Sequence, residues 1–415
     1  MQLKGINHTE VKNCLTAKFE ERLKTILKTG LNGGNKIKAI NTWAIPMLTY
    51  SFGVIKWSQT DILKLETLVR TSLTRFQSHH PQSAVERIML PREYGGRGVL
   101  NIARLHSTQK SNLRQYFLNS TSPLLRVIRA ADDNFTPLQL SATELSTSEA
   151  TPTDEDMIRS WKAKPIHGAH PHEVEADFID RPASNLWLKK GKLYAETEGF
   201  MIAIQDRVVP TRGLRRAIYR ENIEDRCRRC GLLGETIDHI IYGCSCLAAN
   251  DYIMRHNNVA KIIHQQLAKT YGLIAEEVLY FKYQTHPVLE NSAAKLFWDR
   301  SITTDVTVPA TKPDIILFNK SSNTIEIFDI AVPLNRNIQT TYSTKISKYT
   351  PLAIELQQMY RASRVTITPI VISATGLVPK NLISNLEKYS SMHLLKIIQK
   401  AVILDTCSIV RQFLN

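Results

Sequence analysis

Four residues of the kinds that bind zinc fall within one short stretch, "CRRCGLLGETIDHIIYGC", whose spacing is C-x2-C-x8-H-x4-C. Structural zinc takes four cysteine or histidine ligands in a tetrahedron. Two cysteines separated by two residues can hold the metal from one tight turn, and the histidine and last cysteine can complete the set. The stretch therefore predicts a structural zinc knuckle, with no open metal position for chemistry. Its expected ligands are Cys227, Cys230, His239 and Cys244.

The competing interpretation of these cysteines is that they are buried free thiols. Cys246 and His256 lie close in sequence and are alternative ligands if one of the four is misassigned. The chain has six cysteines and no secretion signal, so a disulfide scaffold is not expected. These cysteines are predicted to be intracellular thiols, free or metal-bound.

A second candidate site lies in "KPDIILFNKSSNTIEIFDIAV". Asp314 starts one expected strand and Asp329 lies within the next. The alternation of side chains places Asp329 on one face and Glu326 on the other. A hairpin of this length could bring Asp314 and Asp329 together, and two carboxylates can hold magnesium, which polarises phosphodiesters. The competing interpretation is that the two acids are caps or surface residues.

Two lysines could complete this carboxylate site. Lys345 and Lys348 are three residues apart on an expected helix over residues 344–363, so they share a helical face. One of them could reach the carboxylates, orient the attacking water and stabilise phosphoryl charge. The spacing leaves the choice between the two lysines open.

The formal net charge is +15 and the pI is about 9.5, which favours a polyanionic partner. An anionic membrane surface is the competing partner. No apolar run approaches the roughly 20 residues that a membrane span needs. Five arginines around the knuckle are predicted to contact nucleic acid, with a solvated basic face as the alternative. They are Arg212, Arg215, Arg216, Arg228 and Arg229.

The helices and strands that must position these residues are expected to form an α+β protein with several domains. Residues 1–130 have helical periodicity, as in "DILKLETLVRTSLTRF". Residues 131–182 carry eleven acidic against four basic residues, which predicts a disordered linker. Residues 183–275 are expected to form a helical domain with the knuckle. Residues 276–415 are expected to form an α/β core, with strands over 313–318, 323–332 and 364–373.

These segments together resemble a known family. "LNGGNKIKAINTWAIPMLTYSFGVIKW" and "LPREYGGRGVLNI" resemble the thumb that follows a reverse transcriptase palm. "WLKKGKLYAETEGFMIAIQDRVVPTR", the knuckle and "YIMRH" resemble a linker with a zinc knuckle, while "KPDIILF", "FDIAVP" and "KISKY" resemble a restriction-like endonuclease. The chain is similar to the C-terminal part of a polyprotein of site-specific non-LTR retrotransposons, of the kind that inserts into ribosomal RNA genes.

The resemblance implies that Asp314 and Asp329 bind catalytic magnesium and that Lys345 or Lys348 is the catalytic lysine. In the common restriction-type pattern this lysine lies two residues after the second acid. Ala331 occupies that position here, so the lysine must come from the helix. The resemblance further implies a nuclear protein whose partners are target DNA and element RNA, with no membrane association.

The resemblance predicts an endonuclease that nicks DNA for target-primed reverse transcription. No paired-aspartate polymerase signature occurs in a strand context, and the chain begins about where the palm should end. This chain is therefore expected not to polymerise alone, and to be a fragment, a truncated copy or a host gene. The alternative is a non-catalytic nucleic-acid-binding remnant with an inactive nuclease, and a third possibility is a scaffold protein without affinity for DNA.

Overall fold

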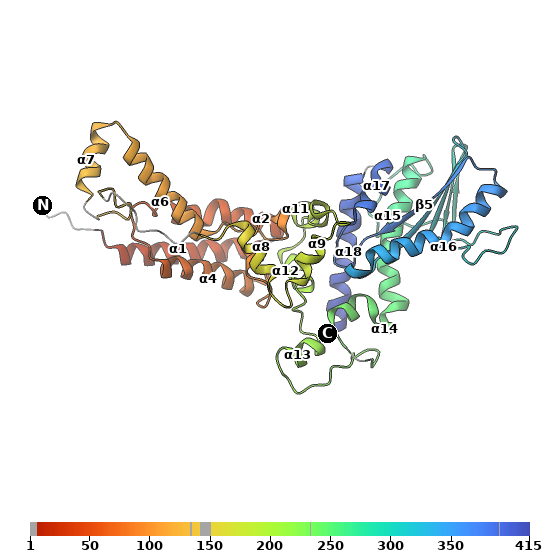
Figure 1. Cartoon of the computed structure of the whole chain (residues 1–415), viewed down its shortest axis with the longest axis horizontal. Coiled ribbons are helices and arrows are strands. Elements are labelled where there is room, and N and C mark those ends of the chain that lie inside the picture. The colour runs from red at the N-terminus through yellow and green to blue at the C-terminus, as the bar shows by residue number, and fades with distance from the viewer. Residues whose placement is uncertain (1–5, 133–134, 142–150, 233, 390) are drawn as a thin grey trace. The chain divides into compact units, whose positions relative to one another are not determined.

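The structure is a computed structural model that describes residues 6–132, 135–141, 151–232, 234–389 and 391–415. It mixes helices with one five-stranded sheet in the part of the chain described (Figure 1). The chain divides into two compact units. Unit 1 is Met1–Gly168 with Lys192–Asp206, and unit 2 is Ala169–Gly191 with Arg207–Asn415. This division does not follow the predicted boundaries at 183 and 276, because the knuckle and the sheet share unit 2.

The regular elements of unit 1 are helices in its described residues, joined by turns and loops. The apolar stripe predicted for α4 is buried from Ile62 to Leu73, and a capping box of Ser58 and Asp61 starts that helix. The elements of unit 1 are α1 (His8–Lys28), α2 (Gly33–Ala39), the π-helix η1 (Ile40–Ala44), α3 (Pro46–Thr49), α4 (Gln59–Arg75), α5 (Glu86–Met89), the 3₁₀ turn η2 (Arg92–Tyr94), α6 (Ile102–Asn119), α7 (Pro123–Ala131), α8 (Asp154–Lys162) and α12 (Ala195–Gln205).

Buried ion pairs hold α12 in unit 1. Arg87 and Asp206 are fully buried and lie 3.0 Å apart, and Arg92 binds both carboxylate oxygens of Glu198 at 3.1 and 2.9 Å. Breaking such a pair from one side leaves an uncompensated buried charge. These arginines of the "LPREYGGRGVL" stretch and its flank are therefore structural residues of unit 1.

The expectation that residues 131–182 form a disordered linker is wrong for part of this range. Residues 154–162 form α8, started by a capping box of Thr153 and Asp156. Met157 and Trp161, four residues apart, are both buried, and Arg87 lies over the Trp161 ring. The acidic composition of the range masked these two apolar anchors. Residues 142–150, the centre of the predicted disordered stretch, lie outside the described residues.

Unit 2 combines short helices, the knuckle, the sheet and three long helices, α15, α16 and α18. Its helical elements are α9 (Ala169–Val174), α10 (Arg181–Ser184), α11 (Leu186–Lys190), α13 (Arg212–Ala217), η3 (His239–Gly243), α14 (Ser245–Leu247), η4 (Ala248–Tyr252), α15 (Ile253–Thr270), η5 (Asn335–Asn337), α16 (Ile338–Met359), α17 (Lys380–Leu386), η6 (Glu387–Tyr389) and α18 (Ser391–Leu414). Its strands are β1 (Val288–Glu290), β2 (Ala294–Trp298), β3 (Ile315–Asn319), β4 (Thr324–Ala331) and β5 (Arg364–Val371).

The sheet has the strand order β1-β2-β3-β4-β5. The first three pairings are antiparallel, and β4 pairs with β5 in parallel after the crossover through α16. The predicted order of strand, strand, helix and strand is confirmed for β3 to β5, and β1 and β2 extend the sheet. Parallel neighbours need such a crossover, usually a helix.

The two faces of the sheet have different coverings. On one face Ile316 and Ile327 pack with Leu352 of α16. On the other face Phe328 lies edge-on to Tyr389, and Trp298 lies edge-on to His264 of α15. Because both faces are buried, β3 and β4 contain nearly continuous apolar runs, and a charged residue within them needs a specific partner.

None of the helices that the structure describes combines the length and the apolar character that a bilayer crossing requires.

Candidate functional site: a Cys/His cluster and a carboxylate–lysine cavity in unit 2

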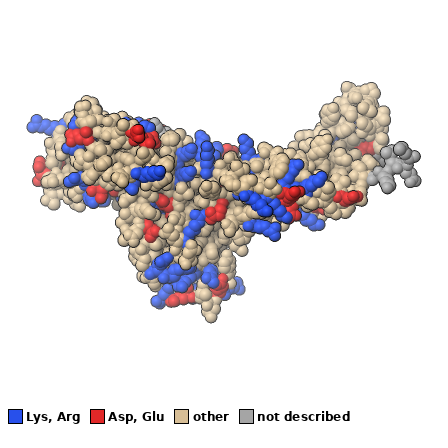
Figure 2. All heavy atoms as spheres, turned by 180° about the vertical axis from the view of Figure 1, so that it is seen from behind, with Lys and Arg blue, Asp and Glu red and all other residues tan. Residues whose placement is uncertain are grey.

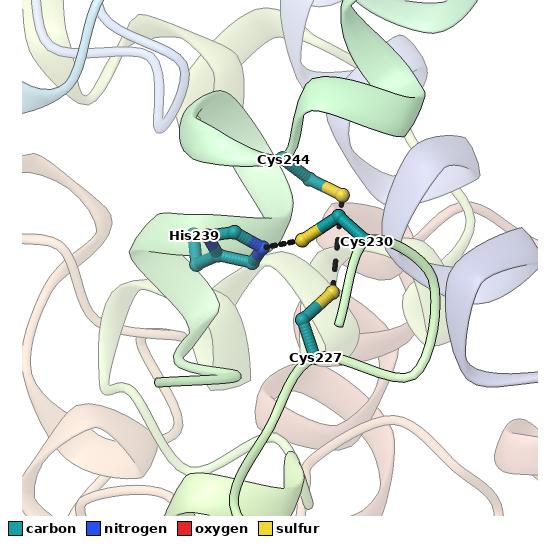
Figure 3. Close-up of side chains that lie close together, drawn as sticks. All are labelled: Cys227, Cys230, His239 and Cys244. Carbon is teal, nitrogen blue, oxygen red and sulfur yellow. Dashed lines mark hydrogen bonds between the residues drawn. The ribbon is translucent and has the colours of Figure 1, made fainter. Parts of the chain in front are cut away.

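The four predicted zinc ligands converge in unit 2. The thiol sulfurs of Cys227 and Cys244 are 3.8 Å apart, and the Cys230 sulfur is 3.3 Å from Nε2 of His239 (Figure 3). All four ligand atoms lie within 4.8 Å of one another. A tetrahedral zinc with Zn–S bonds of about 2.3 Å separates its sulfurs by about 3.8 Å. The cluster could therefore hold a metal ion such as zinc.

The local backbone explains why these cysteines converge. The N–H of Gly231 donates to the carbonyl of Cys227 at 2.9 Å, and the N–H of Cys227 donates to the carbonyl of Leu232 at 2.6 Å. Gly231 has a φ of 74°, a conformation that favours glycine directly after the second cysteine. Burial and the neighbouring thiols raise the pKa of Cys244 to about 12, and a bound metal would favour the thiolate form of this cysteine.

The alternative ligands fall outside the cluster. The Cys246 thiol lies 3.4 Å from the carbonyl oxygen of Arg229, and His256 faces Asp314. Across the described residues, the four predicted ligands are the one group of three or more cysteine, histidine or acidic side chains close enough to share an ion. The spacing alone was therefore sufficient to select the set.

The predicted nucleic-acid-binding arginines all have partners within unit 2. Lys and Arg side chains gather over the part of unit 2 that carries α13, with acidic side chains among them (Figure 2). Arg215 pairs with Glu221 at 2.6 Å, and Arg216 pairs with Asp225 at 3.0 Å. Both arginines remain more than two-fifths exposed, so their ion pairs are weak and leave them able to meet a phosphate.

The remaining predicted arginines have mainly local structural contacts. The Arg212 and Arg229 guanidinium groups donate to the carbonyls of Arg226 and Gln412 at 3.2 and 3.0 Å. Arg228 donates to Glu235 at 2.8 and 3.1 Å and lies over the Phe413 ring. A buried carboxylate holds Arg228, which makes it the least available of the five for nucleic acid.

Glu235 is the acceptor around which the knuckle loop closes. It is fully buried and accepts from the backbone N–H groups of Arg212 and Arg228, each at 2.9 Å. Burial opposes its charge, but the Arg228 guanidinium and these N–H groups hold the pKa of Glu235 below its usual value. Glu235 lies between the candidate metal ligands without a recognisable pattern, so this role could not be predicted from the sequence.

The knuckle is fastened to the last residue of η4 and to the first turn of α15. The Tyr252 hydroxyl accepts from the N–H of Cys244 at 3.1 Å and donates to the carbonyl of Ile240 at 2.7 Å. Arg255 is buried and donates to the carbonyl of Ile241 at 2.8 Å. His256 follows on the first turn of α15, so the knuckle fixes where this histidine lies.

Asp314 and Asp329 meet at one end of the sheet, as the hairpin predicted. The antiparallel register pairs Ile315 with Phe328, so the next position along places Asp314 against Asp329. Asp314 accepts from the N–H of Ile330 at 2.6 Å, which ties it to the neighbouring strand. Asp329 is only 2% exposed, so it is a buried acidic residue and not a surface residue. Acidic side chains are almost never fully buried without a partner.

The two carboxyl groups have opposite pKa shifts. Burial and the charge of Asp314 raise the pKa of Asp329. Burial also opposes ionisation of Asp314, but His256, the N–H of Ile330 and Lys345 together hold its pKa below the usual value. Adjacent carboxylates disfavour double ionisation, and a bound cation would relieve that repulsion.

The structure separates the two candidate lysines. The Lys345 ammonium forms an ion pair with Asp329, and its side chain is about one-fifth exposed. The Lys348 ammonium instead donates to the Tyr349 hydroxyl at 2.9 Å and lies over the ring of that tyrosine. Lys345, Asp314 and Asp329 are therefore brought together, and Lys348 is not.

His256 is a site residue that the sequence interpretation placed elsewhere, as a spare zinc ligand. Its Nε2 lies 3.1 Å from Oδ2 of Asp314, and its Nδ1 lies 3.0 Å from the Asn257 amide oxygen. Oδ2 of Asp314 is thus held by two neighbours, His256 and the N–H of Ile330. This geometry orients the carboxylate and leaves its other oxygen for a ligand.

Replacing His256 should therefore weaken cation binding at the carboxylates. His256→Ala should lower the affinity for Tb³⁺ by about 10- to 100-fold, the usual effect of losing an orienting partner. His256→Gln should restore most of it, because its amide nitrogen can occupy the position of Nε2. Terbium luminescence excited through Trp298, which lines the same cavity, measures the affinity. Equal weakening by both substitutions would contradict an orienting role.

Asp314 and Lys345 line a cavity of about 550 Å³, and Asp329 lies next to both of them behind its wall. Its other walls come from η3, η4, α15, the end of β2 and the end of β4. A pocket of this size can admit a small molecule or part of a polymer. Asp314 and Lys345 are therefore reachable from this cavity.

No protein-family model matches the chain, and no curated protein matches it.

Proposed function

We propose that unit 2 is a metal-dependent DNA endonuclease and that the chain derives from the C-terminal part of a retrotransposon polyprotein. The observation that carries this proposal is the convergence of Asp314, Asp329 and Lys345 beside one cavity. Two acids at adjoining ends of β3 and β4, together with a lysine from α16, are side chains that can carry out phosphodiester hydrolysis. The resemblance of the sequence to a restriction-like endonuclease is consistent with this geometry.

The donor set fits magnesium. Asp314 and Asp329 offer hard carboxylate oxygens, and their two negative charges face a single lysine ammonium. A bound magnesium ion would polarise the phosphodiester and lower the pKa of a coordinated water. The two aspartates would hold the ion, and His256 would orient Asp314.

The residues of the chain then have separate tasks in hydrolysis. Water adds to phosphorus while one P–O bond breaks, which gives a phosphate monoester and a free hydroxyl. The Lys345 ammonium, held beside Asp329, stabilises the negative charge that grows on the phosphoryl oxygens. The covered interior around Asp329 strengthens this interaction relative to bulk water.

Comparing the two lysines tests the proposal. Lys345→Met should reduce nicking of supercoiled DNA by about 10²- to 10³-fold, as for loss of one transition-state charge partner. Lys348→Met is the comparison on the same helix and should reduce nicking much less, because its ammonium donates to the Tyr349 hydroxyl, which lies beside Asp329, rather than to a carboxylate. Equal losses, or a loss only for Lys348→Met, would contradict the assignment of Lys345.

We propose zinc as the metal of the Cys/His cluster and nucleic acid as the partner of the basic face around α13. A second candidate function follows from that face alone, a nucleic-acid-binding module without catalysis. The exposed Arg215 and Arg216 support binding in either case. A filter-binding salt titration should give a steep negative slope of affinity against salt for both functions, and a flat slope would reject both. Nicking then separates them.

A further inference from the structure

The cavity beside the carboxylates has an aromatic side that hydrolysis does not use. Three rings line it together with the ionic groups: Tyr242, Tyr252 and Trp298. Lys345, His256 and Asp314 line the same cavity. One space thus offers flat apolar faces and a phosphate-cleaving set of side chains.

The tyrosine side of the cavity is rigid and partly open. The rings of Tyr242 and Tyr252 are nearly parallel, with an interplanar angle of 16° and centroids 6.5 Å apart. Tyr252 is anchored through its hydroxyl to the knuckle backbone. Tyr242 is 43% exposed, although it lies in η3 beside a metal ligand, so much of its ring is free to meet a ligand.

The indole is also held in place. Trp298 ends β2 and lies edge-on to His264, with centroids 5.4 Å apart. Its neighbour across the sheet, Ile315, directly follows Asp314. The register of β2 on β3 therefore fixes the distance between this aromatic ring and the carboxylate.

A nucleotide has the matching chemistry, because it joins a flat aromatic base to a phosphate. Aromatic side chains stack on bases of any sequence. A base within a duplex has both faces covered by its neighbours, so only an unstacked base can present a face to these rings. Asp314 and Lys345 place charges on the cavity wall that favour a cation or a phosphate as partner. A purely apolar peptide would leave these charges without partners and would therefore bind poorly.

We propose that this cavity receives an unpaired base next to the phosphodiester that is cut, so the substrate is DNA with an unpaired nucleotide at that position. The inference rests on the proposed endonuclease function and specifies its substrate. Tyr242 and Trp298 contact the base, and Asp314 and Lys345 face the adjoining phosphate.

Fluorescence of 2-aminopurine, a reporter of base stacking, tests this. One duplex carries a single unpaired 2-aminopurine and a second carries it paired, and both are titrated with the full-length chain in calcium to slow cleavage. The chain should bind the duplex with the unpaired 2-aminopurine at least about tenfold more tightly than the fully paired duplex. The 2-aminopurine emission of that duplex should change on binding. Equal affinities with unchanged emission would overturn the proposal.

Substitutions at Tyr242 show whether its ring is responsible. Tyr242→Ala and Tyr242→Leu should remove the preference for the unpaired base, and Tyr242→Phe should keep it, because only phenylalanine retains a flat face. If Tyr242→Ala kept the preference for the unpaired base, the base would bind elsewhere and this pocket would be rejected. Nicking of plasmid DNA without any base preference would reject the pocket alone, and base preference without nicking would reject the endonuclease alone.

Discussion

Cys230→Ser should release the metal ion from the knuckle and destabilise unit 2. The purified chain should contain about one zinc ion, and the variant close to none. Structural zinc contributes roughly 10 kcal/mol or more to folding in isolated zinc-finger peptides. Here α15 and α18 retain their own apolar core, so a smaller part of that free energy should be lost and the unfolding transition should move to lower temperature.

Cys246→Ser is the matched control for this loss. Its thiol lies two residues from Cys244 and contacts the Arg229 carbonyl instead of the cluster. The control should therefore keep its zinc and its melting temperature. Metal analysis with calorimetry measures both variants, and a wild-type chain that is folded and free of metal would contradict the structural role.

The knuckle variant should also affect the carboxylate site. Tyr252 and Arg255 connect the knuckle backbone to α15, and His256 lies on that helix against Asp314. Loss of the metal should therefore weaken cation binding at Asp314 in chains that remain folded. Terbium luminescence of Cys230→Ser, compared with Cys246→Ser, follows this coupling.

Asp329→Asn should abolish nicking while leaving the fold intact. It removes one metal-binding charge and the partner of Lys345, and a loss on the order of a thousandfold is expected. Burial and the charge of Asp314 already raise the pKa of Asp329, which means that the folded protein disfavours its charged form. A neutral asparagine of the same shape should therefore keep or raise the melting temperature, as for many functional-site substitutions.

Glu326→Gln, on the same strand, should have the opposite effects on stability and on nicking. Glu326 accepts from Tyr389 and from Thr368, each at 2.6 Å, on the face away from Lys345. This variant should lower the melting temperature and keep nicking per folded molecule. Activity retained by Asp329→Asn, or lost equally by Glu326→Gln, would contradict the division of roles between the two acids.

Periodicity predicted the placement of the acids because β4 is a regular strand. Alternation separated Asp329 from Glu326, and the structure confirms that they contact different elements, α16 and η6. Spacing likewise predicted the Cys/His cluster, since the turn between Cys227 and Cys230 is local. Both features depend on residues near one another in sequence, where a pattern carries direct geometric information.

Contacts over longer separations in sequence could not be predicted in this way. Lys345 and Lys348 share a helical face, and only the packing of α16 on β4 decides which one reaches Asp329. His256 reaches Asp314 from a helix 58 residues earlier, so its sequence neighbours suggested the knuckle instead. The strands β1 and β2 are short and lie beside polar residues. They therefore lack the run of β-branched and aromatic residues from which a strand is predicted.

We propose that Asp314, Asp329 and Lys345 form a metal-dependent nuclease site. Incubation of supercoiled plasmid with the purified chain tests it most directly, in magnesium and in EDTA, beside the Asp329→Asn variant. We expect conversion to open circles in magnesium by the wild-type chain alone, and none in EDTA or with the variant. No conversion by a folded, zinc-loaded wild-type chain, or equal conversion by Asp329→Asn, would contradict the claim.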